Sequence, residues 1–391
     1  MDFLRKKLDE IRKPFNKGGK FEKFAPAINS FDTLLFVPKH NTTKGSHIRD
    51  GVDLKRTMVT VIIALLPAMF FGMYNIGYQH YSQLGENTDL LTCMIFGAWK
   101  FLPMLVVSYG VGLAIEFGFA IYNNHEVNEG YLVSGMLIPL IMPIDFPLWM
   151  LAISVIFAVF IGKEAFGGTG MNIFNPALIA RAFAFFSYAP QMSGDKVWVA
   201  DASTVDAISG ETILGMLAAN QDKAEALVSG AANASWSVME MVLGYIPGSV
   251  GETSAIAVLI GAVILIATGV ASWRIMLGSV LGCAVMGLIF NQIGYNSLMS
   301  FPWWKHMLVG SFLFATVFMA TDPVSGAQTT KGKWIYGFLI GIFGLMIRVF
   351  NGAYPEGWMM AILLMNVFAP TIDHYVVEGN IKKRKNRLKT A

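Results

Sequence analysis

Apolar residues dominate this chain in ten segments that shorter polar stretches separate. A helix needs about 20 mostly apolar residues to cross a bilayer, and fewer where it is broken or re-entrant. The pattern therefore predicts an all-α polytopic membrane protein with ten transmembrane helices, at residues 57–78, 101–122, 131–144, 147–162, 173–189, 254–272, 274–290, 306–321, 333–350 and 357–373.

The polar segments divide the chain, and a long one in the middle separates five spans from five. An odd number of spans in each half gives the halves opposite orientations, as in an inverted repeat. Met142-Pro-Ile-Asp-Phe-Pro147 ends the third span and Met319-Ala-Thr-Asp-Pro323 ends the eighth, its counterpart. Ordinary punctuation of loops by Pro and Gly is the alternative explanation. The predicted parts are a cytoplasmic segment 1–56, a first membrane repeat 57–189, a loop 190–253, a second membrane repeat 254–373 and a basic cytoplasmic tail 374–391.

Composition and charge agree with this pattern and set the orientation. Hydrophobic residues make up 54% and charged residues 14% of the 391 positions, which leaves too little polar surface for a water-soluble globule. Of the 29 Lys and Arg residues, 13 precede Thr57 and six lie from Lys382 to Lys389, so both termini are predicted to be cytoplasmic. The loop 190–253 has two basic and eight acidic residues, which predicts the outer face. Basic ends beside the first and last spans favour topology signals over nucleic-acid binding.

Ionisable residues in or beside the spans are candidates for function, because a charge in hydrocarbon costs several kcal/mol. Glu116 is the only charge in the second span, and Asp373 lies at the cytoplasmic end of the tenth. Asp322 follows the eighth span, where capping a helix or a turn is the alternative role. Carboxylates of this kind suit sodium as hard oxygen ligands. Arg181 in the fifth span is expected either to form a structural ion pair or to lie near the polar edge of a cofactor.

A glycine-rich segment precedes the fifth span but does not match a phosphate-binding loop. Gly167-Gly-Thr-Gly170 lacks the Gly-Lys-Ser/Thr that would follow in a P-loop. Asn172 and Asn175 are three positions apart at a predicted helix start, so they present two amides to one side. Such a pair can bind the edge of a heterocycle, and capping the helix is the competing explanation. The two cysteines, Cys93 and Cys283, lie in apolar surroundings and indicate neither a disulfide nor an iron-sulfur site.

Sequence blocks along the whole chain resemble one known family. The resemblance is to the B subunit of the sodium-translocating NADH:quinone oxidoreductases, with the D subunit of the Rnf complexes as a more distant relative. The blocks that carry it are Gly45-Ser-His-Ile-Arg-Asp50, His125-Glu-Val-Asn-Glu-Gly130, Lys163-Glu-Ala-Phe-Gly-Gly-Thr-Gly170, Phe174-Asn-Pro-Ala-Leu178, Ile246-Pro-Gly-Ser-Val-Gly-Glu252, Met319-Ala-Thr-Asp-Pro-Val-Ser325 and Tyr354-Pro-Glu-Gly357.

The resemblance implies a urea-transporter-like fold of ten helices in inverted halves. It also implies one subunit among six in the bacterial inner membrane, where the other five (A, C, D, E and F) are its partners. Electrons pass to a quinone while sodium leaves the cell. NADH is oxidised elsewhere in the complex, since this chain has no dinucleotide fingerprint. A component of an Rnf complex, a urea-transporter-like channel and a scaffold without a redox role are the alternatives.

In that family a periplasmic flavin transferase attaches FMN to a threonine through a phosphoester. The acceptor pattern matches residues 206–212, Asp-Ala-Ile-Ser-Gly-Glu-Thr, so the resemblance implies a covalent FMN on Thr212 with Asp206, Ser209 and Gly210 as its motif. Glu211 replaces the alanine that is usual before the threonine, which adds a negative charge beside the phosphate.

The resemblance also implies a non-covalent riboflavin, a quinone site and a sodium pathway. Asn172, Asn175 and Arg181 are the candidates for contact with riboflavin. Gly112 and Glu116 are the candidates for quinone, with Leu113 standing where the family has a second glycine. Glu116, Asp322 and Asp373 are the candidate carboxylates of the sodium pathway.

Overall fold

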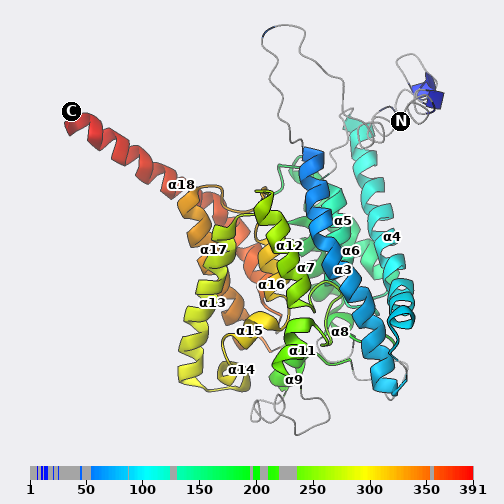
Figure 1. The fold of residues 1–391 in the computed structure, drawn as a ribbon. Coiled ribbons are helices and arrows are strands. Elements are labelled where there is room, and N and C mark those ends of the chain that lie inside the picture. The colour runs from blue at the N-terminus through cyan, green and yellow to red at the C-terminus, as the bar shows by residue number, and fades with distance from the viewer. Residues whose placement is uncertain are drawn as a thin grey trace.

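The computed structural model describes residues 54–86, 88–123, 130–193, 197–202, 210–219, 236–352 and 356–390, with a few isolated positions before residue 54 that include the short helix η1 (Lys13–Phe15). All regular structure in this part of the chain is helical (Figure 1). The predicted all-α class is confirmed.

The first half of the chain forms two long helices and three shorter ones. They are α3 (Leu54–Leu84), α4 (Leu90–Asn123), α5 (Tyr131–Ile141), α6 (Leu148–Phe160) and α7 (Pro176–Ser187), with the short turn η3 (Glu164–Phe166) after α6. Three small helices follow in the predicted outer loop, α8 (Ala189–Met192), α9 (Ile213–Ala219) and α11 (Val238–Leu243).

The second half contains α12 (Ala255–Ala267), α13 (Trp273–Ile293), α17 (Thr330–Phe350) and α18 (Trp358–Thr390) as its longer helices. Between α13 and α17 the chain forms only short pieces, which are α14 (Ser297–Ser300), α15 (Lys305–Leu308), α16 (Phe312–Phe314) and the π-helical turn η4 (Ala315–Met319).

Six helices are long and apolar enough to cross a membrane in the described part of the chain. They begin at Leu54, Leu90, Leu148, Trp273, Thr330 and Trp358. The helices α5, α7 and α12 have only 11, 12 and 13 residues. At about 1.5 Å per residue, each covers less than the roughly 30 Å of a bilayer core. The structure therefore does not confirm ten spanning helices.

Two predicted element boundaries are wrong. The residues between the first two predicted spans, 57–78 and 101–122, are mostly helical, because α3 continues to Leu84 and α4 begins at Leu90. The predicted span 306–321 is broken, since the chain turns at Gly310 with a φ of 72° before α16 begins. Glycine adopts this left-handed conformation without steric cost.

Glycines allow close contact between α13 and α17. A methyl group added to Gly282 would collide with the backbone oxygen of Phe338, and one added to Gly341 would collide with that of Ser279. Small residues four positions apart, as in Gly278/Gly282 and Gly337/Gly341, let two membrane helices approach at backbone distance.

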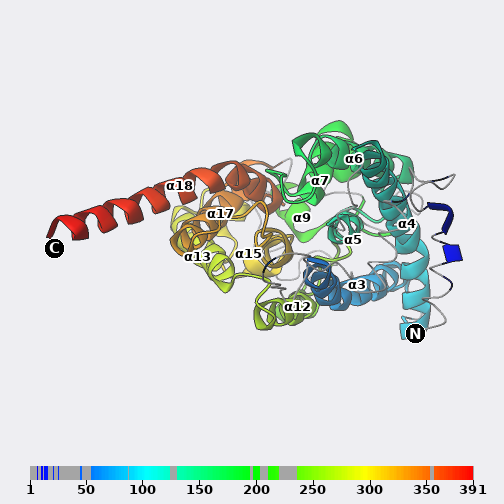
Figure 2. The same cartoon turned by 90° about the horizontal axis from the view of Figure 1, so that it is seen from above.

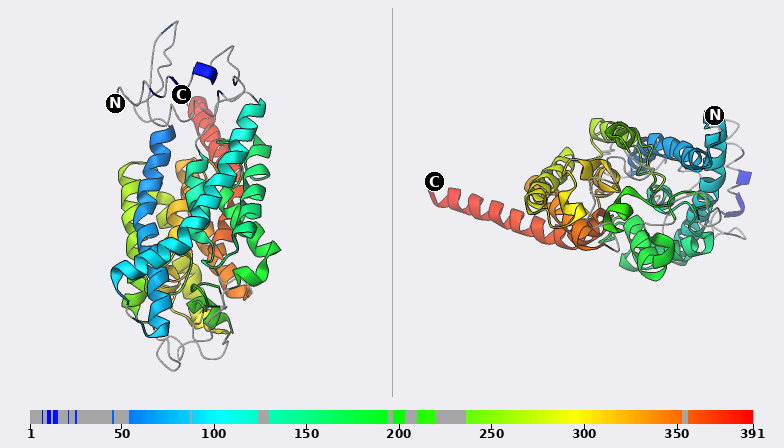
Figure 3. Two further views of the ribbon diagram at one scale, coloured as in Figure 1. Left: turned by 90° about the vertical axis from the view of Figure 1, so that its right-hand side faces the viewer. Right: turned by 90° about the horizontal axis from the view of Figure 1, so that it is seen from below.

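The two halves meet along α3 and α12. Figure 2 shows α4–α7 on one side of the molecule and α13, α17 and α18 on the other. The backbone of Ala64 in α3 lies so close to Gly261 in α12 that a methyl group there would reach within 2.5 Å of it. The helix α3 begins and α18 ends at one end of the molecule, whereas α9 and α11 lie at the opposite end (Figure 1). The last turns of α18 project beyond the other helices (Figure 3).

Candidate functional site

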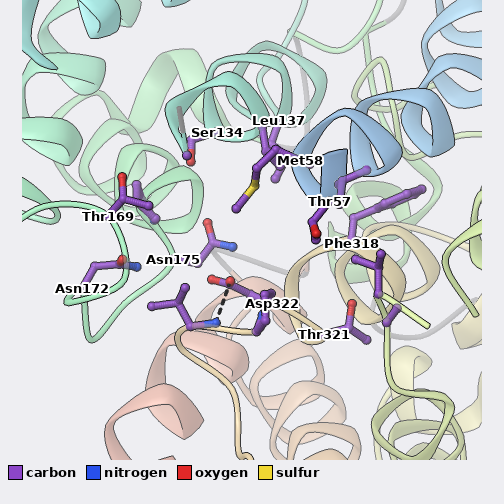
Figure 4. Close-up of a pocket in the computed structure, with 18 of the residues that line it drawn as sticks. Thr57, Met58, Ser134, Leu137, Thr169, Asn172, Asn175, Phe318, Thr321 and Asp322 are labelled. Carbon is purple, nitrogen blue, oxygen red and sulfur yellow. Dashed lines mark hydrogen bonds between the residues drawn. The ribbon is translucent and has the colours of Figure 1, made fainter. Parts of the chain in front are cut away.

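A cavity of about 80 Å³ lies where the two halves meet, near the end at which α3 begins. Five segments form its walls: the starts of α3 and α5, the loop 163–176, the end of α12, and η4 with the turn that follows it. Figure 4 shows Asn172, Asn175 and Asp322 gathered around this cavity together with Thr57 and Met58 of α3. Residues predicted separately for riboflavin and for sodium thus lie together.

The two asparagines have local roles as well as cavity-facing positions. Asn175 caps α7, because its side-chain oxygen accepts a hydrogen bond from Ala177 N at 2.9 Å. Its Pro176 neighbour opens the helix, where the missing N–H costs nothing. Asn172 Nδ2 donates to Phe174 O at 2.8 Å. The predicted capping role is therefore confirmed for Asn175.

Asp322 closes the turn after η4. Its carboxylate accepts hydrogen bonds from Val324 N at 3.1 Å and from Ser325 Oγ at 2.8 Å. Thr321 and Thr169 also line the cavity, and the buried hydroxyl of Thr169 has no hydrogen-bond partner within the described residues. The cavity wall therefore offers oxygen atoms from both halves.

Glu116 forms a buried ion pair with Lys163, which lines the cavity. Lys163 Nζ also lies 5.9 Å from the centre of the Tyr131 ring. Gly112, one turn before Glu116, lies under that ring, since a methyl group there would collide with Tyr131 Cζ. Glu116 and Gly112 thus lie behind the cavity wall rather than in it.

Asp373 joins α18 to the start of α17. Its carboxylate accepts hydrogen bonds from Gln328 N at 2.6 Å, Thr329 N at 3.0 Å and Thr329 Oγ1 at 2.5 Å. Thr329 is itself the N-cap of α17. A carboxylate in this position also complements the positive end of the helix dipole.

Arg181 lies away from the asparagine pair. Its guanidinium donates to Ile141 O, at the end of α5, and lies 3.3 Å from Glu252 Oε1. The same guanidinium lies over the Trp198 ring, 5.5 Å from its centre. Of the two predicted roles for Arg181, the structural ion pair is the one observed.

A second buried arginine, Arg348, occupies a related position near the end of α17. Its guanidinium donates to His306 O at 2.7 Å and to Glu356 O at 3.5 Å, and it lies 4.7 Å from the centre of the Trp358 ring. Both arginines are almost fully buried. Each half therefore places one guanidinium beside a glutamate and a tryptophan.

Thr212 directly precedes α9, at the end of the molecule opposite the start of α3. Its Oγ1 accepts a hydrogen bond from Gly215 N at 3.0 Å, and only 4% of the residue is exposed. Gly210 is also buried, whereas Glu211 is exposed. Asp206 and Ser209 lie outside the described residues.

The segment before Thr212 is attached to the membrane helices by charged groups. Lys100 Nζ of α4 lies 2.6 Å from Asp201 Oδ1 and 3.7 Å from Asp145 Oδ1. Asp201 N donates to Asp145 Oδ2 at 2.6 Å. These contacts join α4, the turn between α5 and α6, and the outer segment.

Four charged site residues, Lys163, Glu252, Arg348 and Glu356, were not identified from the sequence. Two of their pairings join distant positions: Arg181 and Glu252 are separated by 71 positions, and Glu116 and Lys163 by 47. For Arg348 the sequence signal is a single charge within an apolar segment, because such a charge usually has an opposite partner.

Similarity to known proteins extends along nearly the whole chain. Residues 41–382 match the model of the NQR2, RnfD, RnfE family. The B subunit of the Na(+)-translocating NADH-quinone reductase of Chromohalobacter salexigens is 44% identical, over 98% of this chain and 96% of that protein. The proteins of that name from Pseudomonas aeruginosa and Azotobacter vinelandii are 43% and 44% identical, over 98% of this chain and 99% of each relative.

Proposed function

The chain belongs to the NQR2, RnfD, RnfE family, and we propose that it is the membrane subunit of a sodium-translocating NADH:quinone reductase that carries FMN on Thr212. The similarity to B subunits over 98% of the chain is the observation that carries this proposal. Six long apolar helices support a multi-pass membrane protein. The five other subunits, A and C to F, supply the NADH site and complete the complex.

The proposed topology has ten membrane segments in two inverted halves. In each half the third predicted membrane segment contains only short helices and is followed by a turn with an aspartate, Asp145 after α5 and Asp322 after η4. Broken helices of this kind are typical of inverted-repeat transport folds. The start of α3 and the end of α18 lie at the same end of the molecule (Figure 1), which supports two cytoplasmic termini in the bacterial inner membrane.

Thr212 is chemically suited to hold FMN. A threonine oxygen keeps a lone pair when it becomes part of a phosphoester, so it can still accept the hydrogen bond from Gly215 N. The exposed side chain of Glu211 can turn into solvent, which reduces its repulsion of the phosphate. A cavity of only about 10 Å³ adjoins Thr212. It cannot hold a flavin ring, so we place the ring at the outer surface of this chain. The periplasmic flavin transferase needs the segment to open, because Thr212 is buried.

Bound FMN supplies one-electron and two-electron redox chemistry, while the protein fixes its position. This chain contributes the cap at Thr212 and the attachment of the preceding segment through Lys100, Asp145 and Asp201. Both hold the attachment point against the membrane helices.

Riboflavin and quinone are proposed at the opposite end of the molecule. The cavity beside Asn172 and Asn175 is too small to enclose a flavin ring, so these amides can contact only one edge of riboflavin. Gly112 and Glu116 are proposed to shape a quinone site from behind, through Tyr131 and Lys163.

The cavity is also the proposed sodium entrance. Asp322, Asn175 and Thr321 provide oxygen atoms at its wall. Glu116 is neutralised by Lys163, and the three hydrogen bonds of Asp373 hold it at a helix start. Among the three predicted carboxylates, the geometry therefore favours Asp322 for contact with the ion.

Covalent flavin distinguishes this proposed function from that of a channel or a scaffold, neither of which needs a bound flavin. The complex is expressed together with its flavin transferase, and its subunits are separated on a denaturing gel under ultraviolet light. We expect flavin fluorescence on this chain, its loss in Thr212→Val, and its retention in Thr204→Val, which changes a threonine of the same loop without the motif. A dark wild-type band would contradict the redox function.

A further inference from the structure

A second, very small cavity lies beside Thr212, at the end of the molecule opposite the larger one. It has a volume of about 10 Å³, which is close to the minimum that holds one water molecule. Its wall includes Thr212, Glu252, Thr253, Gly310 and Glu356. The cavity thus joins the proposed flavin attachment point to the buried charges of both halves.

Two glutamates face this cavity, Glu252 from the loop between the halves and Glu356 from the second half. Both glutamates are 7% exposed. Burial raises the pKa of Glu252, the Arg181 guanidinium opposes this, and the like charge of Glu356 raises that pKa further. Glu252 pairs with Arg181, and Glu356 Oε2 accepts a hydrogen bond from Ser311 N at 3.2 Å. A carboxylate can accept about four contacts, so these partners do not exhaust either side chain.

Thr253 is a third polar residue in the wall of this cavity. Thr253 is 3% exposed and lines the same cavity, and its hydroxyl has no hydrogen-bond partner within the described residues. A buried hydroxyl without a partner has lost its hydrogen bonds to water, so native proteins usually satisfy it with a water molecule, an ion or a ligand. The cavity beside Thr253 is the space in which such a group fits.

The chemistry of the wall restricts the occupant. Carboxylate and hydroxyl oxygens without nitrogen or sulfur suit hard cations. The volume excludes a hydrated ion but accepts a bare ion that is smaller than water.

We propose that Glu252, Glu356 and Thr253 bind one dehydrated sodium ion beside Thr212. The site is distinct from the larger cavity around Asp322, which lies at the other end of the molecule. Its link to the flavin rests on the proposed function. Two arginines and two glutamates balance each other in charge, and a flavin phosphodiester on Thr212 adds one negative charge that the sodium ion balances. Attachment of FMN therefore strengthens sodium binding.

The test is the sodium-dependent thermal stability of the purified complex, measured in sodium chloride and in choline chloride at equal ionic strength. Sodium that binds only the folded protein raises the melting temperature by mass action. We expect Thr253→Val and Glu356→Gln to weaken the apparent sodium affinity at least about tenfold, since even outer-shell changes cost a metal site that much. Thr253→Ser keeps the oxygen and should retain the wild-type response.

Thr316→Val is the matched control, because it removes another buried hydroxyl that has no partner among the described residues. It should leave the sodium response unchanged. If the cavity holds only water, Thr253→Val will keep the full sodium-dependent shift, and that result overturns the proposal. Thr253→Val is nearly isosteric and removes an unsatisfied group, so it should fold. Covalent flavin, read from gel fluorescence of the same samples, reports on the proposed function separately.

A further variant tests the contribution of the flavin phosphate to sodium binding. Thr212→Val removes the attachment and should weaken, without abolishing, the sodium response. An unchanged response in Thr212→Val, with flavin present in the wild type, contradicts the link between flavin and ion.

Discussion

Glu116 and Lys163 show how a buried charge acquires its meaning from a distant partner. Glu116 could be identified from the sequence as the only charge of its span, but Lys163 lies 47 positions away. Hydropathy contains no information about such a pairing. A functional role of Glu116 stays a prediction. The ion pair with Lys163 gives Glu116 a stabilising role as well.

Removal of either partner should destabilise the complex by about 3–5 kcal/mol, because it leaves an uncompensated buried charge. Glu116→Gln and Lys163→Met test this, and the double variant should recover most of the loss. Thermal unfolding of the purified complex measures all three. If the double variant is as unstable as the sum of the single ones, the pair is not a coupled unit.

Gly112 leaves no space for a side chain. Gly112→Ala would push the Tyr131 ring aside and should cost about 1–3 kcal/mol, as overpacking does. Gly110→Ala in the same helix is the control, since nothing lies within 4 Å of a methyl group there. Melting temperatures and the quinone KM are measured together. An altered KM at unchanged stability would favour direct contact with quinone.

At the scale of the helix, the positions of the apolar segments could be predicted from the sequence, but whether each segment forms one continuous helix could not. The apolar segments at 131–144 and 306–321 are present, yet α5 ends at Ile141 and the later segment breaks at Gly310. Hydropathy sums apolar character over a window and does not record where backbone hydrogen bonds stop. Broken helices are tolerated because protein, rather than lipid, surrounds them. Phe312, Phe314 and Met319 are accordingly fully buried.

Contact between α13 and α17 depends on glycine. Gly282→Ala should lower the melting temperature, because its methyl group meets the backbone oxygen of Phe338, which cannot move independently of α17. Gly379→Ala in α18 has open space and should be neutral or slightly stabilising. Equal melting temperatures for the two variants would contradict the close approach of these helices.

Asp373, which joins α18 to the start of α17, has either a structural role or a role in sodium transport, and a substitution can distinguish the two. Asp373→Asn removes the charge at the N-terminus of α17 and should cost about 0.5–2 kcal/mol. If Asp373 serves only this join, the sodium KM of quinone reduction stays unchanged while the melting temperature falls. A raised sodium KM at unchanged stability would instead place Asp373 in the sodium pathway.

At the scale of the whole molecule, residues from both halves meet at two cavities near opposite ends. The larger one gathers Asn172, Asn175 and Asp322, which the sequence predicted for different ligands. The smaller one adjoins Thr212 and contains two glutamates that were not identified from the sequence. Local motifs identified the first set, whereas only the folded arrangement of the loop 244–254 between the halves brings the second set together.

The most direct test of FMN attachment is the mass of the peptide that contains Thr212, isolated from the complex after expression with its flavin transferase. We predict a mass increased by that of FMN less one water, with fragmentation placing the addition on Thr212. An unmodified peptide, in a preparation whose complex reduces quinone, would contradict the proposed function.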